Sequence, residues 1–182
     1  MRNRLSHTAL FLAATVLLAG CPPPEGWPKP PFDVTGQYAG LWAGRSNEEA
    51  ERQQVIEECP LTINLVQDLT RPYPGDHAVS GTVTVDYSCI TLPEWVNEVP
   101  PQTVNVSGLL GDDGKLTLVS GGCAPGICVV LTLAGQGESI ERGALMDHYA
   151  GSWAYLILLA GVQPFGVTGT FDVVATTPET DG

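Results

Sequence analysis

Beyond Val34, apolar and polar side chains alternate along most of the chain. A period of two is typical of strands that place one face in a core and the other in water. Pro, Gly and Asp separate the strand-like runs, which lie at 34–44, 61–65, 79–86, 103–106, 116–118, 128–135, 144–158 and 166–176. About eight strands at such spacing predict an all-β fold, an antiparallel meander that forms a barrel or a sandwich.

One segment near the start of this pattern has different features. Ser46 and Glu49 show the S-x-x-E spacing of a capping box, and the residues up to Glu58 include neither Gly nor Pro. We therefore predict a short helix near 47–58. Val55 and Ile56 leave an alternative open, because two β-branched residues also suit an extended lead into the second strand.

A short motif occurs near both ends of the alternating region. Tyr38-Ala39-Gly40-Leu41-Trp42-Ala43 recurs as Tyr149-Ala150-Gly151-Ser152-Trp153-Ala154. In a strand the Tyr, Gly and Trp share one face, so a glycine lies between two aromatic rings, an arrangement that lets a sheet coil and close. The first and a late strand are therefore predicted to meet around a barrel. The candidate residues for that closure, or for a pocket inside it, are Tyr38, Trp42, Tyr149 and Trp153.

The two G-x-W segments resemble those of calycin-like barrels, the lipocalins and avidins. They are Gly40-Leu41-Trp42 and Gly151-Ser152-Trp153. The resemblance implies a carrier that holds a small apolar ligand inside the barrel. Eight strands leave room either for one such ligand or for a core filled by side chains.

The amino terminus has the features of an export signal. Arg2 and Arg4 precede a short apolar run at 9–18, well below the ~20 residues that a membrane-spanning helix needs. Leu18-Ala19-Gly20-Cys21 resembles the lipobox of bacterial lipoprotein precursors. The resemblance implies that residues 1–20 are removed and that Cys21 carries acyl chains such as palmitate. These chains would anchor the protein in the cell envelope, on the periplasmic side of the inner or outer membrane or at the cell surface. A plain secretory signal is the alternative.

Residues 21–33 form the expected tether. Its prolines favour a polyproline-II-like spacer that reaches roughly 35 Å. Trp27 and Phe32 are expected to pack on the base of the domain or to lie in the membrane interface, with peptide recognition as the alternative. A single domain is predicted over 34–178, followed by a short tail at 179–182.

The charge balance excludes some partners. The chain carries 8 Lys and Arg against 20 Asp and Glu, a net charge of −12, and loss of Arg2 and Arg4 with the signal would leave −14. Phosphate backbones and anionic headgroups repel such a chain, so we expect no nucleic-acid partner and no flat contact with the membrane. The expected partners are the membrane, through Cys21, and either a protein or a small apolar ligand.

Four cysteines besides Cys21 suggest two disulfides, because an even count in an exported domain is typical of a disulfide framework. Pairing Cys59 with Cys89 at the shared edge of a hairpin places Gln67 opposite Gly81. The pair Cys123–Cys128 encloses a Pro-Gly dipeptide, which suits a bridge across a type II turn. The sequence has no C-x-x-C pair, so we expect no metal site at the cysteines.

The sequence offers no catalytic grouping. It has no G-x-S-x-G motif, and Asp147 and His148 are neighbours in a predicted strand, where their side chains would point to opposite faces. Gly111-Asp112-Asp113-Gly114 has the pattern of a tight turn rather than of a calcium loop. We therefore expect no enzyme, metal or cofactor, and predict a tethered β-barrel that serves as a binding or structural module. An envelope hydrolase that uses carboxylates is the alternative.

Overall fold

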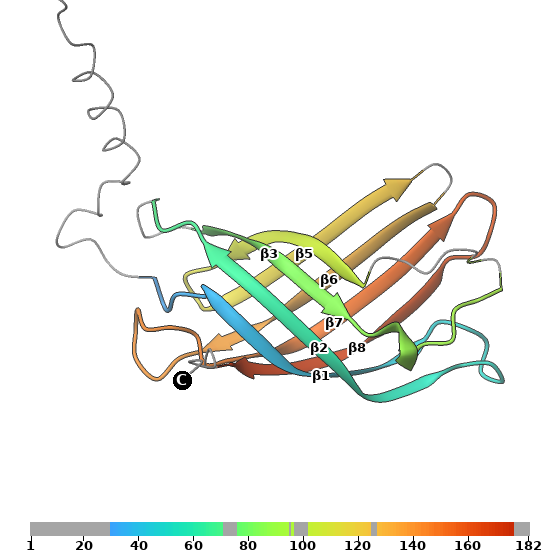
Figure 1. The fold of residues 1–182 in the computed structure, drawn as a ribbon, viewed down its shortest axis with the longest axis horizontal. Helices are drawn as coiled ribbons and strands as arrows, with labels where there is room; N and C mark the ends of the chain where they lie inside the picture. The colour runs from blue at the N-terminus through green and yellow to red at the C-terminus, as the bar shows by residue number, and fades with distance from the viewer. Residues whose placement is uncertain (1–29, 71–75, 95, 97–101, 125–126, 177–182) are drawn as a thin grey trace, which may run out of the picture.

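Eight antiparallel strands follow one another round a closed barrel in the computed structural model (Figure 1). The structure describes residues 30–70, 76–94, 96, 102–124 and 127–176. Cys21, Trp27, the predicted signal at 1–20 and the predicted tail at 179–182 lie outside these residues. The strands are β1 (Gly36–Ser46), β2 (Val55–Gln67), β3 (His77–Val85), β4 (Thr103–Leu110), β5 (Lys115–Ala124), β6 (Ile127–Glu138), β7 (His148–Leu159) and β8 (Phe165–Ala175). Each strand pairs with the next and β8 pairs with β1, which confirms the predicted all-β meander and shows that it forms the barrel rather than the sandwich.

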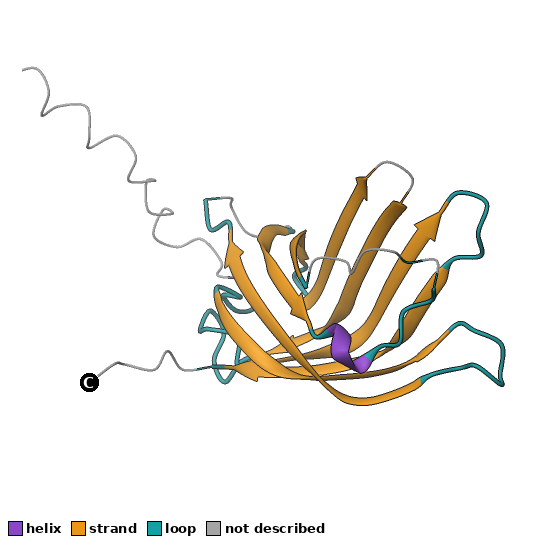
Figure 2. Ribbon diagram, turned by 45° about the vertical axis from the view of Figure 1, so that its right-hand side comes forward, coloured by secondary structure: helices purple, strands orange, loops and turns teal. Residues whose placement is uncertain are grey.

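The helix predicted near 47–58 is wrong. Residues 47–54 form turns and irregular backbone, and β2 already begins at Val55. The Ser46 hydroxyl does not cap a helix: it accepts the backbone N–H of Gln54 at 2.8 Å and donates to the Glu48 carboxylate at 3.1 Å. Val55 and Ile56 pair with β1, so their β-branched preference outweighs the capping pattern. Within the described residues the sole helical element is a single 3-10 turn, η2 (Tyr87–Cys89), drawn purple in Figure 2.

Both predicted disulfides are present, Cys59–Cys89 and Cys123–Cys128. The register expected from the first pair is wrong by two residues, because Gln67 lies opposite Val79 and Gly81 lies opposite Leu65. The reason is that β3 ends at Val85 and η2 then turns the chain back, so Cys89 reaches Cys59 from a turn and not from a paired strand. Cys123 and Cys128, in contrast, are direct partners in the β5–β6 ladder.

The two Tyr-Gly-Trp motifs lie on β1 and β7, the strands on either side of β8, and their side chains pack together inside the barrel. Tyr38, Trp42, Tyr149 and Trp153 are all buried inside it, and the rings of Trp42 and Trp153 lie 4.0 Å apart between centroids. The intervening Gly40 approaches β8 so closely that an added Cβ would stand 2.0 Å from the Asp172 carbonyl oxygen. Here the absence of a side chain lets neighbouring strands coil tightly, and the aromatic rings cover the bend.

The barrel has two distinct ends. We call the end that residues 30–35 join the base, and the opposite end the rim; they lie to the left and right of Figure 1. At the base Phe32 and Val34 are buried, Asp33 pairs with Leu145 in a parallel bridge, and the Gln67 side chain accepts the Val34 N–H at 2.9 Å. The β4–β5 connection, with Gly114 at φ 80°, is the predicted tight turn. The chain therefore enters a base that is packed and hydrogen-bonded.

Candidate functional site

A large hollow lies at the rim of the barrel. It has a volume of about 650 Å³ and lies between the β1–β2 connection, the segment after η2 and the β7–β8 connection. We call it the rim cleft. Its lining residues are Asn47, Glu48, Glu49, Arg52, Gln54, Thr91, Leu92, Pro93, Glu94, Gln163, Pro164 and Phe165.

Asn47 holds one wall of the rim cleft in place. Its side-chain amide donates to the Pro164 carbonyl at 2.8 Å and its Oδ1 accepts the Gly166 N–H at 2.9 Å. The Asn47 backbone N–H also donates to the Gly166 carbonyl at 2.8 Å. One short side chain thus ties the β1–β2 connection to the β7–β8 connection, although 117 residues separate Asn47 from Pro164.

Gln54 holds the second wall in the same manner. Its Oε1 accepts the Thr91 N–H at 2.8 Å, and its Nε2 donates to the Thr91 carbonyl at 2.7 Å and to the Glu48 carboxylate at 3.1 Å. Such paired side-chain to backbone bonds satisfy groups that a strand ladder would otherwise pair. Because these hydrogen bonds join three connections, the cleft is preformed, which lowers the entropic cost of binding a ligand.

The charges of the rim cleft are mainly acidic. Glu48, Glu49 and Glu94 line it, with Arg52 as the basic residue. The Arg52–Glu49 pair is 3.3 Å long with both side chains largely exposed, so it adds little to stability. Phe165 is buried, and Leu92 packs against the core. The cleft therefore combines an acidic border with an apolar floor, which suits a basic or neutral chain better than an anion.

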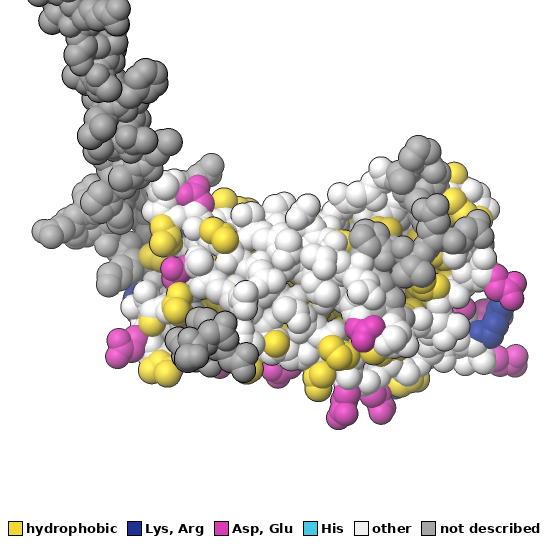
Figure 3. Space-filling view, in the orientation of Figure 1, with side chains coloured by type: hydrophobic (Ala, Val, Ile, Leu, Met, Phe, Trp, Pro, Cys, Tyr) yellow, Lys and Arg dark blue, Asp and Glu magenta, His cyan; other side chains and the backbone are white. Residues whose placement is uncertain are grey.

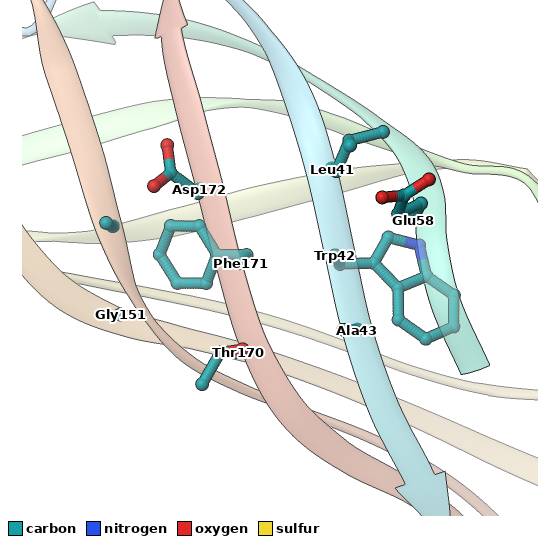
Figure 4. Close-up of a pocket in the computed structure, with 9 residues that line it drawn as sticks. Leu41, Trp42, Ala43, Glu58, Gly151, Thr170, Phe171 and Asp172 are labelled. Atoms are coloured by element: carbon teal, nitrogen blue, oxygen red, sulfur yellow. The ribbon is translucent and has the colours of Figure 1, made fainter. Parts of the chain in front are cut away.

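A second hollow of about 400 Å³ lies on the side wall over β1, β7 and β8 (Figure 4). Trp42 and Glu58 flank one side, with the indole nitrogen of Trp42 turned toward Glu58, and Phe171 and Asp172 flank the other. Glu58 has a φ of 54° at a β-bulge, where the register shifts between Trp42 and Gly44. The hollow follows from this bulge and from the small residues beside it.

His148 lies on the outer wall with carboxylates from two neighbouring strands. Its Nε2 is 2.9 Å from Asp172 Oδ1, and its Nδ1 is 3.7 Å from Glu138 Oε2. Asp147, its neighbour in sequence, instead accepts the Ile140 N–H at 2.9 Å. These partners of His148 could not be predicted from the sequence because they come from other strands, Asp172 from β8 and Glu138 from β6. In the described part of the chain no group of three His, Cys, Asp or Glu side chains is placed to hold a metal ion.

The four aromatic residues singled out in the sequence lie in the core rather than in the rim cleft. Tyr38 donates its hydroxyl to the Val34 carbonyl at 3.0 Å, and Tyr149 to the Leu116 carbonyl at 2.9 Å. Burial raises the pKa of both phenols well above the usual value, and for Tyr38 the nearby Asp33 carboxylate adds to this effect. Trp42 Nε1 is buried without a hydrogen-bond partner at the edge of the side-wall hollow.

On the face shown in Figure 3, the outer wall between the two ends is poor in charge. Acidic side chains lie toward the ends and the lower edge of this face, while the middle is largely white, which marks uncharged polar side chains and backbone.

None of the helical structure in the described ranges is long and apolar enough to cross a membrane. Comparison with family models, with curated proteins and with solved structures gives no match to this chain.

Proposed function

We propose that this protein is a non-enzymatic lipoprotein of the cell envelope, whose barrel binds a protein partner at the rim cleft. The observation that carries the proposal is the position of the cleft relative to the amino terminus. The chain joins the barrel at the base, and the rim cleft lies at the opposite end. A lipid anchor at Cys21 would thus direct the cleft away from the bilayer.

The dimensions support this orientation. β1 has 11 residues, and a strand rises ~3.3 Å per residue at a tilt near 40°, so the barrel is about 28 Å tall. Added to the roughly 35 Å of an extended tether, this height puts the rim about 60 Å from the membrane surface. A partner that floats free or sits on an opposing surface could reach the cleft without touching lipid.

A protein partner fits the site better than an apolar molecule held inside the barrel. Within the described residues, eight buried aromatic side chains and many Leu and Val residues occupy the interior. The rim cleft, in contrast, is open, combines polar and acidic side chains with an apolar floor, and is held by Asn47 and Gln54. Its border of three glutamates favours a partner segment with Lys or Arg, or a neutral one.

The anchor and the binding site can be tested separately. Metabolic labelling with a radioactive or clickable palmitate should label the native protein and not the Cys21→Ser variant. For binding, a photo-crosslinking amino acid at Arg52 should capture an envelope protein in cells, whereas the same group at Asp112, in the turn at the base, should not.

Matched substitutions complete the test. Asn47→Ala removes two side-chain hydrogen bonds that tie the rim, and should reduce crosslinking from Arg52. Asn105→Ala, on the exposed outer wall, should leave it unchanged. A native protein that takes up no palmitate label but still crosslinks from Arg52 would refute the anchor alone. Equal crosslinking from Arg52 and Asp112 would refute the rim cleft as the binding site.

A further inference from the structure

The rim half of β5 has a strand partner on one side only. β4 and β5 pair from Leu110↔Leu116 to Ser107↔Val119, and there the pairing ends. β5 continues to Ala124, and its pairing with β6 continues to Ala124↔Ile127. Figures 1 and 2 show β4 and β5 diverging toward the rim. Within the described residues, Ser120–Ala124 is therefore an open strand edge.

The orientation of the unpaired backbone groups follows from the disulfide partners. Cys123 and Cys128 lie directly opposite with a Cα–Cα distance of 4.0 Å, the short spacing of a non-hydrogen-bonded antiparallel pair. The N–H and C=O of Cys123 therefore point away from β6, and by alternation so do those of Gly121. Val119 has the same parity, and it is the last β5 residue that still meets β4.

Within the described residues, this edge lacks the usual protection. Natural edge strands carry charged side chains, prolines or bulges that prevent another strand from pairing with them. Here Gly121, Gly122 and Cys123 are exposed, and a Cβ added at either glycine would meet nothing within 4 Å. No residue from Leu116 to Gly137 is charged, in a chain whose net charge is −12. The hairpin thus presents a bare, uncharged edge.

We propose that two copies of this chain associate through the Ser120–Ala124 edge as an antiparallel strand pair. A two-fold axis beside Gly122 places Gly121 opposite Cys123 of the second copy, and the reverse. Each such pair exchanges two backbone hydrogen bonds, so the contact contains four. A two-fold antiparallel edge is self-complementary, and two strongly acidic molecules can approach along a hairpin with no carboxylates.

The contact is short, so we expect a weak dimer in solution that anchorage on one membrane would strengthen through a raised effective concentration. Sedimentation velocity of the full chain carrying Cys21→Ser, from about 10 µM to 1 mM, should show reversible dimers. Gly121→Asp places a carboxylate at the edge where space is free, and should raise the dissociation constant about tenfold or more. Ser80→Asp adds the same charge to the exposed wall of β3 and should change it little.

A crosslink tests the register. In the same Cys21→Ser background, Gly122→Cys should give a disulfide-linked dimer on mild oxidation, because the two Gly122 positions face each other as a close pair, and Ser80→Cys should not. Monomers at every concentration, or dimers equally sensitive to Gly121→Asp and Ser80→Asp, would overturn the proposal. In the first case the open edge would be left for a different polypeptide.

Discussion

The closure of the barrel depends on a glycine, and Gly40→Ala tests this directly. A methyl carbon at Gly40 would stand 2.0 Å from the Asp172 carbonyl oxygen and 2.8 Å from the Val173 Cα, both of them backbone atoms of β8. Contacts of this kind do not occur below 3.0 Å. β8 must therefore withdraw from β1 by about 1 Å, and backbone cannot rotate out of the way as a side chain would.

The cost can be worked from the contacts that the withdrawal disturbs. Gly40 lies opposite Val173 in the β1–β8 ladder, and at least two backbone hydrogen bonds of that ladder would lengthen. At about 1 kcal/mol each they account for about 2 kcal/mol. Loosening the Trp42–Trp153 contact adds about 1 kcal/mol. We expect Gly40→Ala to lose about 3 kcal/mol in the free energy of unfolding, or about 6–12 °C in Tm.

Urea unfolding followed by tryptophan fluorescence, with both disulfides intact, measures this loss. Gly121→Ala is the matched control: the same substitution is made in a strand, but nothing lies within 4 Å of the new Cβ. It should change stability by less than about 0.5 kcal/mol. If Gly40→Ala were as stable as Gly121→Ala, close strand approach would not be the reason for glycine at the closure.

Three further predictions concern the disulfides, a buried phenol and the bulge. Replacing both cysteines of Cys59–Cys89, 30 residues apart, should cost about 3.5 kcal/mol in urea unfolding, against about 2 kcal/mol for Cys123–Cys128, because the longer loop restrains the unfolded chain more. Because burial raises the pKa of Tyr149, the folded state keeps a proton that the unfolded state releases near the ordinary value of 10. The free energy of unfolding should therefore fall above about pH 10. In an alkaline titration followed by circular dichroism, Tyr149→Phe should flatten that fall. Glu58 has a φ of 54°, so Glu58→Gly should leave the free energy of unfolding unchanged or raise it by up to about 1 kcal/mol. Glu58→Val should lower it by about 1–2 kcal/mol in the same urea assay.

The strands, the barrel and the disulfides could be predicted because their signals are local. Alternation at a period of two needs only neighbouring residues, and the Cys123–Cys128 hairpin is contained in six consecutive positions. The predicted register of β2 and β3 is wrong because it places Cys59 opposite Cys89 in the ladder, whereas η2 separates Cys89 from the paired strand. The helix at 47–58 was wrong because a capping pattern is a weak signal where the β-branched Val55 and Ile56 gain a strand partner.

The candidate site could not be predicted because its parts are distant in sequence. Asn47 meets Pro164, and Gln54 meets Thr91, only after the barrel has closed. The same holds for His148, whose carboxylate partner Asp172 lies 24 residues away on the next strand. In each case the sequence shows a polar residue in a loop or strand, and its partner depends on the register of several strands and on the geometry of the turns between them.

Substitutions at the two ends of the barrel should have different effects. Those at the base should change the stability of the fold, and those at the rim should change the shape of the rim cleft. At the base, Phe32, Val34 and Met146 are buried in the core, and Tyr38 donates a hydrogen bond to the Val34 carbonyl, so changes there act on the folded state as a whole. At the rim, Asn47 and Gln54 fix the shape of an exposed cleft through hydrogen bonds of modest energy. Substitutions at the rim should therefore cost the fold little, whereas substitutions at the base and at the closure should destabilise the barrel. A protein held at its base and free at its rim would accordingly vary most among the residues that line the rim cleft.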